Sequence, residues 1–184
     1  MKYSYLCDMN QRNGMRPQDI AVLLKIIISN PNWMNKDIAE DLFLSPSEVS
    51  YSLQRSALAE LLDTSKRKVM RKAFLEFIQY GLPRVFPAIR GSIAIGIPTA
   101  FSSPVMLPYL MTNQLNEMVV WPYAEGTARG ETINPLYPNA VQAALKDQKL
   151  YELLSLVDVM RIGKVREKEI ALRLLQEKFS IHHA

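Results

Sequence analysis

The chain has 184 residues, a length that allows one or two domains. Apolar residues make up 48%, which is enough for a hydrophobic core, and the formal charge of +4 permits an anionic partner without requiring one. The single cysteine, Cys7, excludes an intramolecular disulfide, as is typical of proteins in a reducing compartment. The first fourteen residues lack an apolar run of signal-peptide length, and the longest apolar run, residues 93–101, is interrupted by Gly96 and Pro98. We therefore expect a cytoplasmic protein that does not span a membrane.

The first predicted helix begins at Arg16 or Pro17 and ends before the turn-forming residues 30–32. Its apolar side chains recur at helical spacing, at Ile20, Leu23, Leu24, Ile27 and Ile28. This pattern predicts an amphipathic helix that covers the two helices after it.

Residues 35–62 predict two short helices joined by a tight turn. The first covers residues 36–42, the turn covers residues 43–45, and the second helix runs from Pro46 to about Leu58. Ser45 is a favourable N-cap, Pro46 occupies a position where proline is tolerated, and Glu48 completes a capping box. The apolar set has helical spacing and consists of Ile38, Ala39, Leu42, Val49 and Leu53. Together these features predict a helix-turn-helix.

This stretch resembles the DIAxxLxxSxSxVSxxLxRL core of winged-helix bacterial regulators, including the multiple-antibiotic-resistance-regulator type. Later phrases, among them FIQYGLPRVFPAIRGSIAIGIPTAFSSP and VWPYAEGTARG, resemble those of a group of bacterial winged-helix transcriptional regulators. The resemblance implies a winged-helix fold and double-stranded DNA as the partner.

A basic run follows the second helix, with five Lys or Arg among the nine residues 64–72. No clear pair of alternating strands accompanies it, so we expect the wing to be reduced or displaced. A fourth helix is predicted from about Lys66 to Tyr80, ended by Gly81.

The second half mixes strands and helices. Prolines predict an extended segment at residues 83–87, and the β-branched residues 92–99 predict a strand. If residues 84–86 paired with residues 93–95, the hairpin could serve as the displaced wing. The remaining predicted elements are a strand at 118–121 within ordered loop, a helix at 140–145, a helix over residues 150–160 closed by Gly163, and a last helix at 164–179 whose second apolar side indicates a partner chain.

The second helix of a helix-turn-helix lies in the major groove of DNA. With its apolar side turned inward, the expected outward residues are Ser45, Ser47, Ser50, Tyr51, Gln54 and Arg55. Gln54 can pair with adenine, and Arg55 with guanine or phosphate. The basic run would neutralise flanking phosphates through Lys66, Arg67, Lys68, Arg71 and Lys72.

A second interpretation stays open, because Glu48 and Glu60 leave the second helix without net positive charge. It is a winged-helix adaptor, or the regulatory partner of a neighbouring enzyme, that binds protein instead of DNA. Residues 64–72 could likewise be a solvated face.

The sequence shows no general base, nucleophile or metal-binding constellation, so we expect no enzyme, no cofactor and no metal. His182 and His183 lie at the chain end, and Cys7 has no histidine near it in sequence. We expect Arg129 to brace the second domain, and we place Glu152 and Asp158 on helix surfaces.

The expected fold class is α+β, mostly helical. Residues 15–80 would form a winged-helix-like DNA-binding domain, and residues 81–184 a small mixed domain used for dimerisation or partner binding. The leading hypothesis is a sequence-specific transcriptional regulator that binds DNA as a homodimer.

Overall fold

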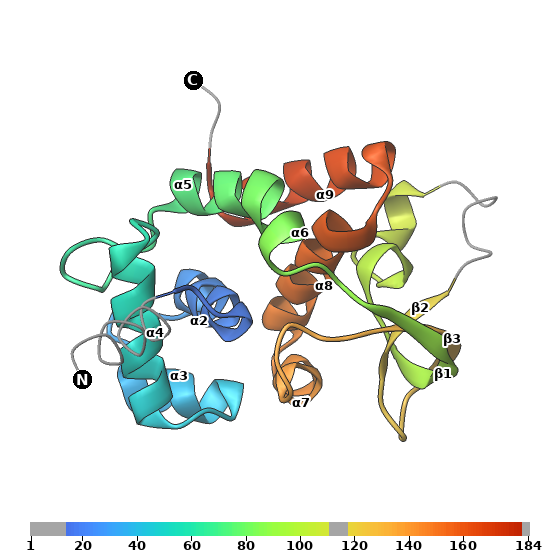
Figure 1. Ribbon diagram of the computed structural model, residues 1–184, viewed down its shortest axis with the longest axis horizontal. Coiled ribbons are helices and arrows are strands. Elements are labelled where there is room, and N and C mark those ends of the chain that lie inside the picture. The colour runs from blue at the N-terminus through green and yellow to red at the C-terminus, as the bar shows by residue number, and fades with distance from the viewer. Residues whose placement is uncertain (1–13, 111–117, 182–184) are drawn as a thin grey trace, which may run out of the picture. The chain divides into compact units, whose positions relative to one another are not determined.

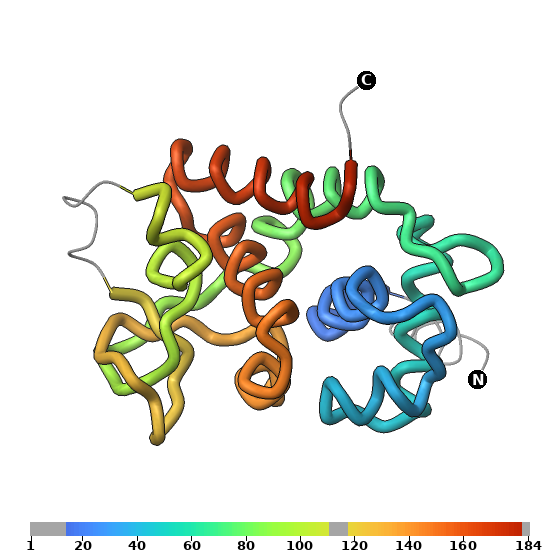
Figure 2. The backbone as a smooth tube through the Cα atoms, turned by 180° about the vertical axis from the view of Figure 1, so that it is seen from behind, coloured from blue at the N-terminus to red at the C-terminus, as the bar shows by residue number. Residues whose placement is uncertain are grey.

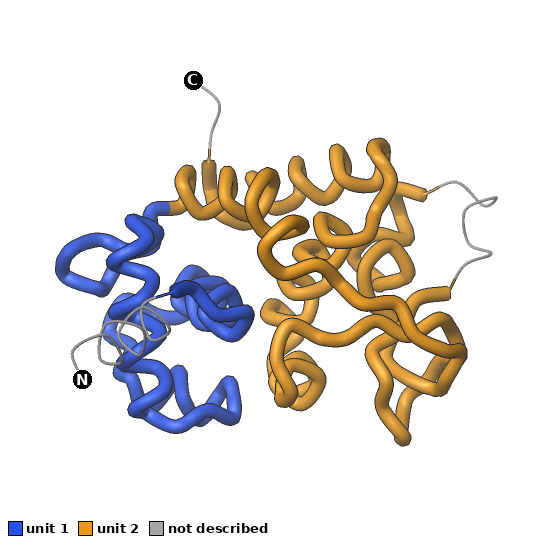
Figure 3. Tube along the Cα trace, in the orientation of Figure 1, with its two compact units in different colours: residues 1–70 blue, residues 71–184 orange. Residues whose placement is uncertain are grey.

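A computed structural model describes residues 14–110 and 118–181. It divides into two compact units, Met1–Met70 and Arg71–Ala184 (Figure 3). The division falls ten residues before the expected boundary near residue 80, because residues 71–80 are helical and pack within the second unit. There the ring of Phe74 stacks on that of Phe179 at a centroid distance of 5.7 Å. The fold is α+β and mostly helical, as the sequence predicted.

The described residues of unit 1, 14–70, contain the three helices α2 (Pro17–Ile28), α3 (Asn35–Leu42) and α4 (Pro46–Leu58) (Figure 1). Their predicted bounds are confirmed to within about one residue. Residues 19–26 of α2 are all buried. Both α3 and α4 pack on it.

A short loop replaces the start of the predicted fourth helix. Leu62 and Val69 form an antiparallel bridge, and the Met70 N–H donates to the Leu61 carbonyl at 2.9 Å. The predicted start at Lys66 is wrong because Lys66 has a φ of 57°, which lies outside the right-handed helical region.

The helix that begins unit 2 passes through the glycine that was expected to end it. α5 (Arg71–Glu76), η1 (Phe77–Gly81) and α6 (Leu82–Val85) follow one another without a break. Gly81 is right-handed helical, and η1 is a π-turn that ends two residues before Pro83, where a regular helix would lose a hydrogen bond. The extended segment predicted at residues 83–87 is therefore wrong over residues 83–85. The hairpin of residues 84–86 with 93–95 does not form.

Three strands make the sheet of unit 2: β1 (Arg90–Pro98), β2 (Val119–Pro122) and β3 (Ala128–Ile133). β1 pairs antiparallel with both others, and β2 pairs parallel with β3, so the strands close on themselves. Glycine permits this closeness, because a Cβ on Gly96 would lie 1.9 Å from the Trp121 carbonyl oxygen. The predicted strands near residues 92–99 and 118–121 are confirmed, whereas β3 was expected to be loop.

Helices α7 (Ala140–Lys146), α8 (Gln148–Ile162) and α9 (Val165–Lys178) complete unit 2, close to their predicted bounds. Two short 3-10 turns, Ala100–Ser102 and Leu107–Tyr109, follow β1. α8 is buried over residues 153–161 and contacts both α7 and α9, which lie beside it in Figures 1 and 2. It is the central helix of this unit. No helix within the described residues is long and apolar enough to traverse a bilayer.

Candidate functional site

The α3–turn–α4 segment has the local geometry of a helix-turn-helix. Phe43 adopts a left-handed conformation with a φ of 53°, which reverses the chain after α3, and the Leu44 N–H donates to the Ala39 carbonyl at 2.9 Å. The Ser45 hydroxyl accepts the Glu48 N–H at 3.1 Å, as expected of an N-cap. The predicted capping box is half formed, because the Glu48 carboxylate accepts from Gln18 Nε2 at 3.2 Å.

The exposed face of α4 carries an uncharged stripe. Ser47, Tyr51, Gln54 and Leu58 follow one another at spacings of four, three and four residues, so they share one face of the helix, and all are exposed. Tyr51 is 59% exposed. Ser45 is also exposed and Ser50 is half-buried. Hydroxyl, phenol and amide groups are therefore presented together on one side.

Arg55 does not belong to this exposed face, so its predicted contact with DNA is corrected. Only 5% of Arg55 is exposed. Its Nε and Nη2 donate to the two carboxylate oxygens of Asp19 at 2.8 and 2.5 Å. Asp19 lies in the first turn of α2 and is fully buried. Because a bidentate pair of this kind fixes both position and orientation, the charge of Arg55 locks α4 onto α2.

Residues 63–68 form a loop organised by one carboxylate. Asp63 accepts the N–H groups of Arg67 and Lys68 at 2.8 and 2.9 Å, and the Ser65 hydroxyl at 2.5 Å. These hydrogen bonds, led by that from Lys68, lower the pKa of Asp63 to about 2. Lys66 is half-buried and Lys68 is exposed, so the ordered loop presents these two lysines.

Two other cations of the predicted basic run, Arg67 and Arg71, have partners elsewhere, and Lys72 is exposed in unit 2. The Arg67 guanidinium lies over the Trp33 ring at 4.1 Å and donates to the Trp33 carbonyl at 2.8 Å. Arg71 belongs to unit 2, where it donates to the Phe179 carbonyl at 2.8 Å. The run is therefore not one continuous basic surface, and Lys66 and Lys68 are what it offers to an anion within unit 1.

The described part of unit 1 carries no net charge. Residues 14–70 contain seven basic and seven acidic side chains. The net positive charge of the chain thus lies outside the described part of unit 1. Any DNA contact by α4 would rest on hydrogen bonds and apolar contacts more than on net charge.

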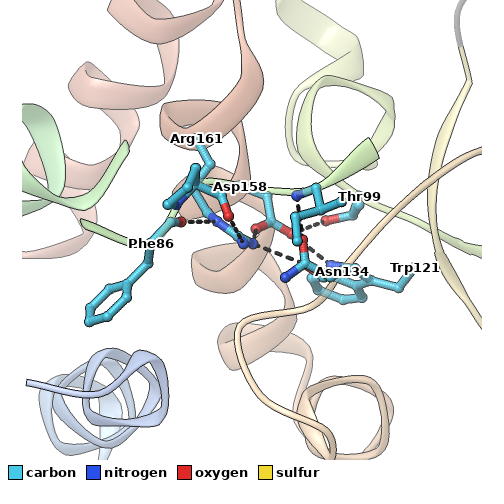
Figure 4. Close-up of polar contacts among 8 residues, drawn as sticks. Phe86, Thr99, Trp121, Asn134, Asp158 and Arg161 are labelled. Carbon is cyan, nitrogen blue, oxygen red and sulfur yellow. Dashed lines mark hydrogen bonds and ion pairs between the residues drawn. The ribbon is translucent and has the colours of Figure 1, made fainter. Parts of the chain in front are cut away.

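A second polar cluster lies inside unit 2 (Figure 4). Asp158, which is 1% exposed, accepts hydrogen bonds from Thr99, Trp121 and Arg161 at 3.0, 2.6 and 2.7 Å. Burial raises the pKa of Asp158, while the positive charge of Arg161 and these hydrogen bonds oppose the shift. Asp158 was expected on a helix surface, and that expectation is wrong because α8 is buried on both sides.

Arg161 extends the cluster to the chain segments on either side of the sheet. It donates to the carbonyls of Phe86, Asn134 and Pro87 at 2.9, 3.1 and 3.3 Å. One ion pair therefore holds the chain before β1 and after β3 against α8. Asp158 and Arg161 lie three residues apart in the otherwise apolar stretch 156–162 of α8, and this spacing is the sequence signal that could have revealed the pair.

The remaining candidates lie on the surface or outside the described residues. Glu152 pairs with Lys178, within unit 2, and Arg129 is exposed on β3. Cys7, His182 and His183 fall outside the described residues. Within the part of the chain that the structure describes, no group of three or more His, Cys, Asp or Glu side chains is placed to hold a metal ion.

No protein-family model, no curated protein and no solved structure matches this chain.

Proposed function

We propose that this chain is a sequence-specific transcriptional regulator that binds double-stranded DNA as a homodimer, with α4 as the helix that enters the major groove. The observation that carries the proposal is the division of α4 into two faces. Its inner face is fixed to α2 by the Asp19–Arg55 pair, and its outer face presents Ser47, Tyr51 and Gln54. A rigid helix with an exposed polar face near its N-terminus suits base readout.

The proposed roles follow from the chemistry of each group. Gln54 offers the amide that can pair with adenine, and the Tyr51 ring can contact a thymine methyl group. The hydroxyls of Ser45, Ser47 and Ser50 can bond phosphates or base edges. Arg55 no longer has a place in this set.

We infer further that unit 1 is a winged helix with a reduced wing. The bridge between Leu62 and Val69 supports this, because it closes a loop of six residues that begins a few residues after α4. In this proposal Lys66 and Lys68 contact phosphates on the flank of the site, while Arg67 anchors the loop to Trp33.

A selection from a random duplex library at low salt tests the proposal. We expect one enriched sequence with two-fold symmetry, and a loss of affinity of about 1–3 kcal/mol for Gln54→Ala on that duplex. Gln142→Ala is the matched control, since Gln142 is an exposed glutamine on α7. Absence of enrichment, or equal losses in both variants, would contradict base readout by α4.

A protein-binding adaptor is the second candidate, and one observation favours it. Residues 14–70 of unit 1 have no net charge and expose five large apolar side chains, Met34, Phe43, Tyr51, Leu58 and Met70. Exposed apolar groups on a neutral surface suit a protein partner. If the wild-type chain retains no duplex at low salt, this candidate replaces the first.

A further inference from the structure

The outer face of the β1–β3 pair carries two isoleucines that the described residues leave open. Ile93 and Ile95 are 66% and 53% exposed, at alternate positions of β1. Directly opposite them on β3 lie Glu131 and Arg129. Opposed residues of antiparallel strands share one face, so these four side chains form a single patch, which we call the hairpin face.

In an ordinary half-buried sheet the large apolar residues face inward, whereas here the small residues face inward and the isoleucines face outward. Ala94 and Gly96 alternate with the two isoleucines, and Gly130 separates the two charged residues. A Cβ on Gly130 would lie 2.3 Å from the Met118 carbonyl oxygen, so this side must stay small. The register therefore fixes the large apolar side chains outward, where folding within the subunit gains little from them.

The charges of the hairpin face are complementary to a second copy of itself. A two-fold axis in the interface, parallel to the sheet and perpendicular to the strands, exchanges the Ile93–Glu131 pair with the Ile95–Arg129 pair. Ile93 then lies on Ile95 of the other copy, and Glu131 lies opposite Arg129. Each contact occurs twice, as in an isologous interface.

We propose that two copies of this chain associate through the hairpin face, formed by Ile93, Ile95, Arg129 and Glu131. Glu131 already pairs with Arg90 of its own subunit, and a carboxylate has a second oxygen for the partner's arginine. This proposal names the surface of the homodimer on which the proposed function rests. The association is measured without DNA, so a failure to dimerise is distinguished from a failure to bind DNA.

The last helix, expected from the sequence to supply this surface, offers less. Leu174, one of the residues that widened its apolar side, is only 6% exposed. Val165 at the start of α9 is exposed, beside a hollow that Tyr80 and Arg84 also line. Val165 therefore marks the rival surface in the test.

Charge reversal on the full chain, followed by sedimentation velocity over a range of concentrations, tests the hairpin face. A single hairpin face is small against the ~800 Å² per partner of a standard interface, so we expect a concentration-dependent dimer. Arg129→Glu and Glu131→Arg should each weaken it at least ~10-fold, because like charges then face each other. An equimolar mixture of the two variants should restore it, since both charge pairs are satisfied in the mixed dimer.

Lys149→Glu is the control for charge alone, because Lys149 is exposed on α8, outside the hairpin face, and undergoes the same reversal as Arg129. Circular dichroism checks that each variant is folded. A wild-type chain that stays monomeric, a mixture that does not recover the dimer, or a dimer lost only in Val165→Glu would overturn the proposal. Ile93→Ser should weaken association with no change of charge, and an unchanged dimer in that variant would also overturn it.

Discussion

Two buried arginines, Arg55 and Arg161, each hold a buried aspartate and thereby fix one side of a helix. Such pairs contribute little relative to apolar side chains of the same shape, but losing one partner leaves an uncompensated charge. Each pair therefore acts as a constraint on packing and geometry. Arg55 orients α4, and Arg161 holds the segments that flank the sheet.

Removing Arg55 should destabilise unit 1 far more than removing its exposed neighbour. We expect Arg55→Ala to lower the free energy of unfolding by about 3–5 kcal/mol, because Asp19 stays buried without its partner. Gln54→Ala, at the adjacent exposed position, should stay within about 0.5 kcal/mol. Native-state hydrogen exchange of α2 and α4 amides measures both. Equal effects in the two variants would contradict the structural role of Arg55.

The pH dependence of stability should carry the signature of Asp158. Burial raises its folded pKa above the unfolded value of about 3.9, so the protonated form favours the folded state. This contribution is fully present below about pH 4 and is lost as the pH rises through the folded pKa.

Asp158→Asn removes the titrating carboxyl group, so comparison with this variant isolates the contribution of Asp158 to the pH dependence of stability. The free energy of unfolding of the wild type relative to this variant should fall as the pH rises from about 4. Hydrogen exchange of α8 amides at several pH values is the measurement. A difference that stays constant or grows with pH would show that the pKa is not raised.

At the scale of elements, the N-cap of α4 is the smallest change that tests the helix-turn-helix geometry. Ser45→Ala removes the acceptor of the Glu48 N–H and should cost about 1 kcal/mol. Ser47→Ala, two residues later and exposed, should cost little. Chemical denaturation measures the free energy of unfolding of the two variants. A loss of stability in Ser47→Ala as large as that in Ser45→Ala would be inconsistent with the cap.

The pKa of Asp63 tests whether the loop of residues 63–68 is ordered. The carboxylate accepts hydrogen bonds from two backbone N–H groups and a hydroxyl, so Asp63 should titrate with a pKa of about 2. Because the folded pKa is depressed, these contacts stabilise the loop above about pH 4 and are lost as the pH falls through about 2. A carboxyl-detected NMR titration gives the value directly, and a pKa near 3.9 would mean that the loop is open.

Periodicity predicted the helices well, because α2, α3, α4, α8 and α9 each repeat apolar residues at helical spacing. Periodicity failed where the same residues are compatible with two local structures. Gly81 and Pro83 are typical of a helix end, yet a π-turn admits both, and β3 alternates too weakly to differ from a loop. These outcomes depend on tertiary packing that a single stretch of sequence does not contain.

The outward set on α4 was predicted from the positions that face inward, and it holds for Ser47, Tyr51 and Gln54. It failed for Arg55 because its partner, Asp19, lies 36 residues earlier in the chain. Helical spacing assigns a face, but it does not reveal a long-range ion pair.

For DNA binding by the whole molecule, the balanced charge of residues 14–70 predicts an affinity that depends only weakly on salt. With Lys66 and Lys68 as the phosphate contacts of each subunit, the slope of log affinity against log salt should be about −4 for a dimer. Lys68→Ala should make it shallower by about 2, whereas Lys149→Ala on α8 should not change it. Fluorescence anisotropy at several salt concentrations gives the slope, and a value near zero would exclude these contacts.

In the proposed complex the exposed face of α4 enters a groove of DNA. Amide chemical shifts, recorded while the selected duplex is added to the full chain, test it most directly. The proposal predicts the largest changes at Ser47, Tyr51 and Gln54, with smaller ones at residues 63–68. If the duplex changes none of the α4 amides, or changes only residues of unit 2, α4 is not the helix that reads DNA.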